Sequence, residues 1–227
     1  MKRTLTAAIA LAGWISTVMV PAHAALSLTQ RADIRPVKFT TARIIFNGEI
    51  IPNKALELIE ALDRLHYTSP ELKKITLYIN SYGGDMDSGY LLYQAIKKSA
   101  VPITTVNIAM TASSATLMYC AAKERLVMPA AVFLLHPSSV GNLNRPYIRS
   151  DELAGLKQLN DNGNLLFKTV YKSCTNLQDS ETDQLLASES NRMLLNASQA
   201  IEHKMAEGMA EGVVEADISL IITDDKS

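Results

Sequence analysis

Two residues of this 227-residue chain, Ser113 and His136, have the types and surroundings that covalent catalysis by a serine requires. Ser113 lies among small residues where an apolar helix is predicted to begin, so its hydroxyl either caps the helix or acts as a nucleophile. His136 follows the apolar run 132–135, and a buried strand there would hold the imidazole in place as a base. For each residue alone, a helix cap or a core histidine is the simpler interpretation.

A third feature, the pair Gly83–Gly84, has a possible role in the same chemistry. It stands between a predicted strand and a predicted helix. Backbone without side chains can turn its amides into a cleft, where they stabilise a developing oxyanion. An isolated Gly-Gly pair is more often only a tight turn.

The elements that must position these residues alternate along the chain. Strand-like runs are predicted at 37–46, 75–79 and 102–106, and helical runs at 54–66 and 88–98. Strands that alternate with helices indicate an α/β fold built from βαβ units.

Three segments resemble the Clp protease proteolytic subunit family. Ile75–Gly84 is similar to its strand and Ser-Pro-Gly-Gly turn, Met110–Ala115 to its nucleophile motif, and Pro129–Pro137 to the segment that carries its base. The resemblance implies an α/β, ClpP/crotonase-like fold of repeated ββα units with a long protruding helix. The segment 151–174 is the candidate for that helix, through which such subunits pack ring against ring.

The resemblance also implies roles at individual positions. Ser113 is expected to be the nucleophile, His136 the general base, and the amides of Gly84 and Ser114 the oxyanion donors. The implied activity is that of a serine-type endopeptidase, which hydrolyses peptides or unfolded polypeptide through an acyl-enzyme.

The third member of the triad is expected to be Asn191, with Glu189 as the fallback. The family carries an aspartate shortly before a helix with a small polar cap, and Asn196–Gln199 reads as that cap. Counting back without a gap reaches Arg192, which cannot accept the imidazole proton. Allowing one inserted residue selects Asn191, whose amide oxygen can orient a neutral histidine.

The N-terminus has the pattern of a secretory signal peptide. Lys2 and Arg3 precede an apolar run, 5–20, that is shorter than the roughly 20 residues of a membrane-spanning helix, and Ala22-His23-Ala24 follows. Cleavage after Ala24 is expected to leave residues 25–227 as one peptidase domain in the periplasm or outside the cell. The family's ATP-driven partner is absent from that compartment, so no ATPase partner is expected.

Composition excludes several other classes. The full chain has a net charge of −1, and loss of Lys2 and Arg3 makes it about −3, with no basic patch that suggests nucleic acid. Zinc-binding spacings such as Cys-x-x-Cys are missing, and neither a metal nor a cofactor is expected. Cys120 and Cys174 are the only cysteines, and either a disulfide or two buried thiols fits the sequence.

The active enzyme is expected to be a homo-oligomer, for which a ring is one arrangement. Two alternatives to this enzyme remain open. One is a catalytically inactive relative that serves as a scaffold or binding protein. The other is an exported peptidase of the signal-peptide-peptidase kind with a serine-lysine pair, in which Lys157, Lys168 or Lys172 is the base.

Overall fold

The computed structural model describes residues 25–29, 39–141 and 146–224, in which strands alternate with helices. The signal-peptide interpretation concerns residues 1–24, which lie outside the described residues. The strands are β1 (Ala25–Thr29), β2 (Thr41–Asn47), β3 (Lys74–Ser81), β4 (Ile103–Ala112), β5 (Glu124–Val127), β6 (Val132–Leu135), β7 (Met193–Asn196), β8 (Gly208–Met209) and β9 (Ile218–Thr223). The helices are α1 (Pro52–Thr68), α2 (Met86–Lys97), α3 (Ala115–Cys120), α4 (Ser150–Cys174), α5 (Asp179–Ala187), α6 (Ala197–Glu202) and the 3₁₀ helix η1 (Glu189–Asn191).

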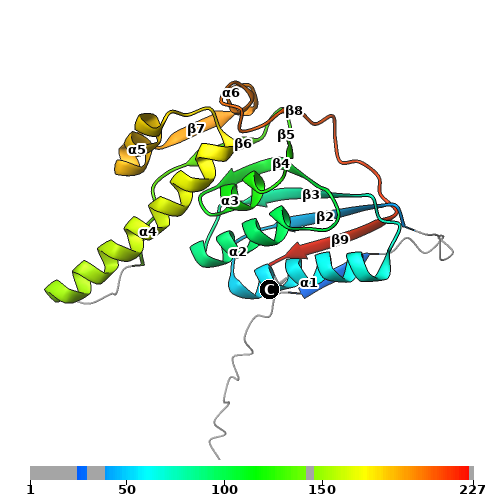
Figure 1. Ribbon diagram of the computed structural model, residues 1–227, viewed down its shortest axis with the longest axis horizontal. Coiled ribbons are helices and arrows are strands. Elements are labelled where there is room, and N and C mark those ends of the chain that lie inside the picture. The colour runs from blue at the N-terminus through cyan, green and yellow to red at the C-terminus, as the bar shows by residue number, and fades with distance from the viewer. Residues whose placement is uncertain (1–24, 30–38, 142–145, 225–227) are drawn as a thin grey trace, which may run out of the picture.

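The strands form one mixed sheet in the order β1-β9-β2-β3-β4-β5-β8. The strands from β9 to β8 in that order run parallel, and β1 adds to β9 in the opposite direction. A side branch pairs β6 parallel with β4 and β7 antiparallel with β6. The predicted α/β class is therefore confirmed (Figure 1).

Strand β4 is longer than the sequence pattern predicted. The expected strand stopped near Asn107, but β4 continues to Ala112. Asn107 is fully buried, and its side-chain amide donates a hydrogen bond to the carbonyl of Val132. A satisfied buried amide is tolerated inside a strand, so this polar residue marks no turn. The extension gives β4 two partners on one side, β5 along its first half and β6 along its second.

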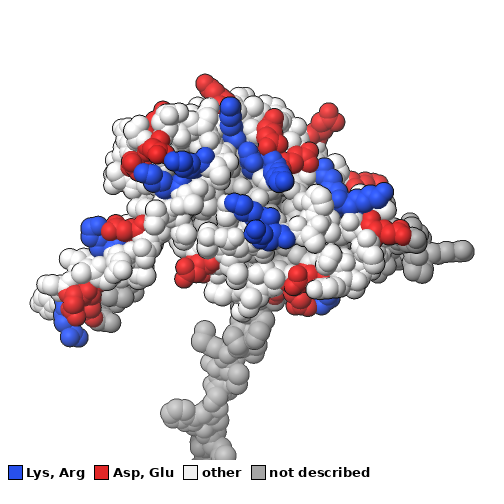
Figure 2. All heavy atoms as spheres, in the orientation of Figure 1, with Lys and Arg blue, Asp and Glu red and all other residues white. Residues whose placement is uncertain are grey.

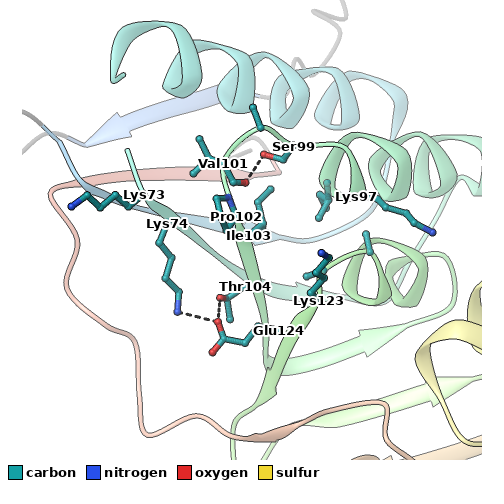
Figure 3. A pocket seen from close by; sticks show the side chains of 14 residues that line it. Lys73, Lys74, Lys97, Ser99, Val101, Pro102, Ile103, Thr104, Lys123 and Glu124 are labelled. Carbon is teal, nitrogen blue, oxygen red and sulfur yellow. Dashed lines mark hydrogen bonds and ion pairs between the residues drawn. The ribbon is translucent and has the colours of Figure 1, made fainter. Parts of the chain in front are cut away.

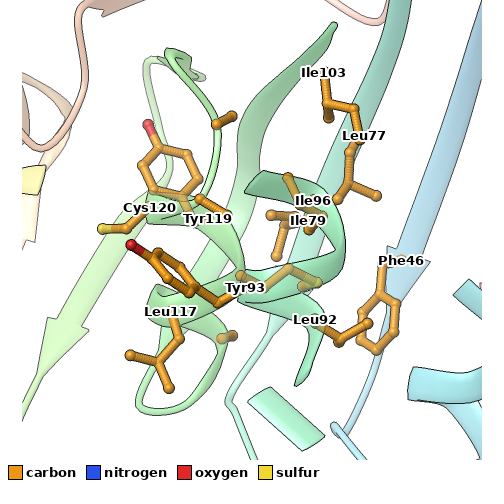
Figure 4. Close-up of a cluster of buried hydrophobic side chains, with 14 of the residues drawn as sticks. Phe46, Leu77, Ile79, Leu92, Tyr93, Ile96, Ile103, Leu117, Tyr119 and Cys120 are labelled. Atoms are coloured by element: carbon orange, nitrogen blue, oxygen red, sulfur yellow. The ribbon is translucent and has the colours of Figure 1, made fainter. Parts of the chain in front are cut away.

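Helices α1, α2 and α3 cover one face of the sheet (Figure 1). Strand β3 is buried over most of its length, as expected for a central parallel strand. In Figure 4, Leu117 of α3 lies beside Tyr93 of α2, and Ile96 of α2 lies beside Ile79 of β3. The short helix that follows the candidate nucleophile is thus part of the main core.

Helix α4 projects away from the rest of the molecule (Figure 1). Its observed bounds agree with the predicted 151–174 to within one residue. Its fully buried residues lie in the second half, from Gly163 to Cys174, whereas Leu153 and Leu159 of the first half are 59% and 61% exposed.

The base of α4 is joined covalently to α3. Cys120 and Cys174 form a disulfide, with Cα atoms 5.5 Å apart. This answers a question that the sequence left open. The two cysteines end their respective helices, so the bond ties the end of α3 to the end of α4.

Acidic and basic side chains are interspersed on the face seen in Figure 2. None of the helices among the described residues is long and apolar enough to cross a membrane.

Candidate active site

Ser113 is the first residue after β4 and has a left-handed backbone, with a φ of 52°. For a residue with a Cβ atom this conformation costs about 1–2 kcal/mol. Two contacts hold it: the Ser113 amide donates to the carbonyl of Leu134 at 3.1 Å, and its own carbonyl accepts from the amide of Thr116 at 2.9 Å. The chain therefore makes a sharp strand-to-helix turn with the half-buried Ser113 at its bend.

The Gly83–Gly84 turn lies directly against Ser113. Gly83 has a φ of 95°, and a Cβ atom placed there would come within 2.7 Å of the Ser113 Cβ atom. Gly84 has a φ of 145°, and its Cβ atom would come within 2.2 Å of the carbonyl oxygen of Ile50. Both positions require glycine for conformation and for space, so the pair is more than a flexible loop.

The two amides expected to bind an oxyanion have no acceptor among the described residues. Neither the Gly84 amide nor the Ser114 amide donates a hydrogen bond to any residue in 25–29, 39–141 or 146–224. The Ser114 hydroxyl donates to the carbonyl of Gly84 at 3.2 Å, which ties the two segments together. Gly84 is exposed and Ser114 is fully buried.

His136 reaches the same end of the sheet because β6 lies beside β4. Ala112 pairs with Leu134 in parallel register, so Ser113 and His136 follow the carboxyl ends of neighbouring strands. Such strands lie about 4.8 Å apart. The His136 side chain is only 19% exposed. The nucleophile and base predicted from the sequence thus follow adjacent strands at one edge of the fold.

The carboxylate beside His136 belongs to Glu189, the fallback residue. Its Oε2 atom lies 3.3 Å from the imidazole Nδ1 atom of His136, and its Oε1 atom lies 3.3 Å from Arg192. The Nδ1 atom is buried and lacks an aligned hydrogen bond to any described residue, so the two groups are close but not yet in bonding geometry.

Asn191 makes no hydrogen bond to His136 among the described residues. Its side-chain amide instead donates to the carbonyl of Gln184 at 2.7 Å. The reason lies in the β6–β7 pairing: Leu135 pairs antiparallel with Met193, which carries the chain before β7 back past His136. Counting residues back from a helix cap cannot locate this turn. A search for a carboxylate just before β7 would have selected Glu189.

The three lysines considered as alternative bases are engaged elsewhere. Each forms an ion pair with an aspartate on the molecular surface: Lys157 with Asp161, Lys168 with Asp183 and Lys172 with Asp179. The hydrogen bond that Lys168 donates to Asp183 raises the pKa of Lys168, whereas a lysine base requires a lowered pKa. The geometry therefore does not favour a serine-lysine pair.

A cavity of about 350 Å³ lies at the other end of the strands (Figure 3). Its wall includes the start of β4 and the ion pair between Lys74 and Glu124, whose Nζ and Oε2 atoms are 3.1 Å apart. Hydrogen bonds from Thr104 and Lys74 lower the pKa of the Glu124 carboxyl. Since Ser113 follows the opposite end of β4, this cavity is separate from the candidate active site.

The chain is similar to proteolytic subunits and related peptidases. It is 28% identical over 178 residues to ATP-dependent Clp protease proteolytic subunit 2 of Treponema pallidum, covering 75% of this chain and 83% of that one. It is 37% identical over 101 residues to proteolytic subunit 1 of Chlamydia muridarum, covering 44% of this chain but only about half (52%) of that protein.

Solved structures show the same fold at low identity. A ClpP1 mutant from Listeria monocytogenes has a TM-score of 0.60 and 20% identity, covering 75% of this chain and 91% of that one. A mutant of the membrane-bound stomatin-specific protease 1510-N has a TM-score of 0.61 and 13% identity, covering 78% and 82%. The family model of the Clp protease matches residues 29–217, most of the chain. The protein therefore belongs to the Clp protease family.

Proposed function

We propose that this protein is an exported serine peptidase that hydrolyses peptides or unfolded segments through an acyl-enzyme, without an ATPase partner. Ser113 is the nucleophile, His136 the general base and Glu189 the carboxylate that orients it. The amides of Gly84 and Ser114 bind the oxyanion. The observation that carries the proposal is the turn at Ser113: a serine with a φ of 52°, packed against a two-glycine turn and one strand away from His136.

The arrangement supports a defined sequence of steps. The Ser113 hydroxyl attacks the peptide carbonyl while the Nε2 atom of His136 takes its proton and then returns it to the leaving amine. Water, activated by the same imidazole, releases the acyl group. The Glu189 carboxylate faces the other ring nitrogen and stabilises the imidazolium. Each oxyanion donor contributes on the order of 100-fold in rate.

Export agrees with two features of the fold. Disulfides form and persist mainly in oxidising compartments, and Cys120 and Cys174 are paired. Cleavage after Ala24 leaves Ala25 as the first residue of β1, which pairs with β9. The expected cut therefore falls at the edge of a structured element and removes none of it. ATP is not supplied in such a compartment, and the sequence carries no Gly-x-x-x-x-Gly-Lys loop of its own.

The proposed assembly is a homo-oligomer, as in the family, with α4 at a subunit contact. Leu153 and Leu159 are exposed on the projecting half of this helix. Large apolar side chains on an element that extends from the fold favour burial against another subunit.

The decisive experiment is labelling of the mature protein with a fluorophosphonate probe, followed by mass-spectrometric mapping of the modified residue. We expect modification at Ser113 and nucleotide-independent cleavage of short fluorogenic peptides. Ser113→Ala should abolish both, while Ser114→Ala should retain labelling at Ser113. Labelling at Ser114 would overturn the nucleophile assignment. No labelling and no cleavage would favour the inactive scaffold.

A further inference from the structure

Thr116 connects the turn at Ser113 to the projecting helix α4. Its hydroxyl donates to the carbonyl of Ser113 at 2.6 Å and lies 2.9 Å from the hydroxyl of Tyr171 in α4. Thr116 and Tyr171 are both fully buried. Water therefore does not compete for the hydrogen bond between the two hydroxyls.

The direction of the hydrogen bonds follows from the number of hydrogens. Thr116 has one hydroxyl hydrogen, and the Ser113 carbonyl can only accept it. The Tyr171 hydroxyl must then donate to the Thr116 oxygen. Burial raises the pKa of Tyr171 well above its usual range, more than the bond to Thr116 lowers it, so the phenol keeps its proton at any working pH.

The end of α4 that carries Tyr171 is held firmly. Cys174, one turn further along, is bonded to Cys120 at the end of α3, and the Tyr171 ring stacks on Phe167 with ring centroids 5.4 Å apart. Thr116 and Tyr171 therefore join two elements whose relative position is already fixed.

From this geometry we infer that Tyr171, acting through Thr116, is a positioning residue that holds the Ser113 peptide in its left-handed conformation. We call the two hydrogen bonds from Tyr171 through Thr116 to Ser113 the relay. It ends on the Ser113 carbonyl, whose orientation is set by the ψ angle of Ser113. The inference rests on the proposed function, because positioning matters only if Ser113 reacts.

The test compares two buried tyrosines: Tyr171 of α4, whose hydroxyl meets Thr116, and Tyr119, which belongs to α3 itself. Tyr171→Phe removes the relay hydroxyl and keeps the ring. Tyr119→Phe is the matched control, since Tyr119 is equally buried and its hydroxyl donates to Leu126, away from Ser113. We expect Tyr171→Phe to lower kcat for peptide hydrolysis about tenfold with KM unchanged. The reason is that loss of this hydrogen bond destabilises the transition state and not the bound substrate. Tyr119→Phe should leave kcat near that of the parent.

Substitutions at Thr116 give a second comparison. Thr116→Val removes both hydrogen bonds with little change of volume, whereas Thr116→Ser keeps the hydroxyl. Valine should lower kcat at least as much as Tyr171→Phe, and serine should restore most of it. Equal kcat losses in the two tyrosine variants, or full activity with valine, would mean that the relay has only a structural role.

Amide hydrogen exchange of the peptide that contains residues 113–117 gives a readout that is independent of activity. It should be faster in Tyr171→Phe than in Tyr119→Phe, because the amide of Thr116 donates to the Ser113 carbonyl. If the parent protein neither cleaves peptides nor reacts with the probe, the proposed function fails. The comparison of amide exchange rates still tests whether the relay exists. Equal exchange in the two variants overturns the relay.

Discussion

At the scale of single residues, two adjacent serines differ in backbone conformation and burial, and we propose that this difference separates their chemical roles. Ser113 has a left-handed backbone and a half-buried side chain at the bend between β4 and α3. Ser114 is helical and fully buried, and its hydroxyl is already committed to the carbonyl of Gly84. A left-handed backbone costs about 1–2 kcal/mol for a residue with a Cβ atom. Such strain is typical of reactive positions, where the surrounding contacts hold the residue in place.

The triad assignment gives a prediction at the same scale. Glu189→Gln keeps the shape of the side chain but removes the charge that stabilises the protonated His136. We expect kcat to fall on the order of 100-fold, within the range of general acid–base contributions, with little change in the urea midpoint because Glu189 is 57% exposed. Steady-state peptide hydrolysis by the two proteins measures the effect.

Asn191→Ala is the control for this prediction. It deletes the hydrogen bond to Gln184 and nothing at the imidazole, so kcat should stay close to that of the parent. If instead Asn191→Ala is inactive and Glu189→Gln is fully active, the residue predicted from the sequence is the correct one.

At the scale of elements, the disulfide binds the ends of α3 and α4 across 54 positions of sequence. Closing a loop of this length stabilises a fold by about 4 kcal/mol in the chain-entropy account. We expect reduction to lower the urea midpoint of the mature protein. The double variant Cys120→Ala, Cys174→Ala should unfold at a similarly low midpoint and be insensitive to reductant. An unchanged midpoint after complete reduction, verified by thiol alkylation, would contradict a stabilising role.

A carboxylate joins the starts of β2 and β9, which are neighbouring strands of the sheet. One oxygen of Asp217, just before β9, accepts hydrogen bonds from the amides and hydroxyls of Thr40 and Thr41 beside β2. The backbone hydrogen bond from Thr40, followed by that from Thr41, lowers the pKa of the Asp217 carboxyl. A lowered pKa in the folded state means that the contribution to stability is present above the pKa of the unfolded chain, near 4, and is lost as pH falls below it.

Asp217→Asn tests this linkage. We expect the variant to be less stable than the parent at pH 7 and to approach it as the pH falls below about 4, where the parent carboxyl also becomes neutral. Urea unfolding across this pH range measures the difference. A stability difference that stays constant with pH would show that the carboxylate charge contributes nothing.

At the scale of the whole molecule, the proposed export predicts which form of the protein is the active one. The single tryptophan, Trp14, lies within the proposed signal peptide. The exported form should begin at Ala25 by intact mass and show tyrosine emission only. A secreted form that retains tryptophan would disprove cleavage after Ala24.

The proposed oligomer gives a second prediction for the whole molecule. Leu153→Glu with Leu159→Glu places two charges on the exposed half of α4, and we expect the oligomer to become smaller by light scattering. Leu56→Glu on α1 is the control, since Leu56 is as exposed (59%) as Leu153. An oligomer that is unchanged by the double substitution would exclude this part of α4 from the contact.

The sequence by itself determined the α/β class and the strand β6. These features depend on hydrophobic periodicity and on glycine or proline within a few residues, and such local signals can be read without knowing the partners of each segment. The motif resemblance then indicated which serine and which histidine to consider.

Only the tertiary structure decided the rest. The pairing of Cys120 with Cys174, the approach of Glu189 to His136 and the link from Tyr171 to Ser113 each join segments tens of residues apart. Their contacts depend on how β7 pairs with β6 and how α4 lies against α3, and neither arrangement has a local sequence signal. The same reason explains β4: Asn107 reads as the end of a strand until its buried partner, the carbonyl of Val132, is known.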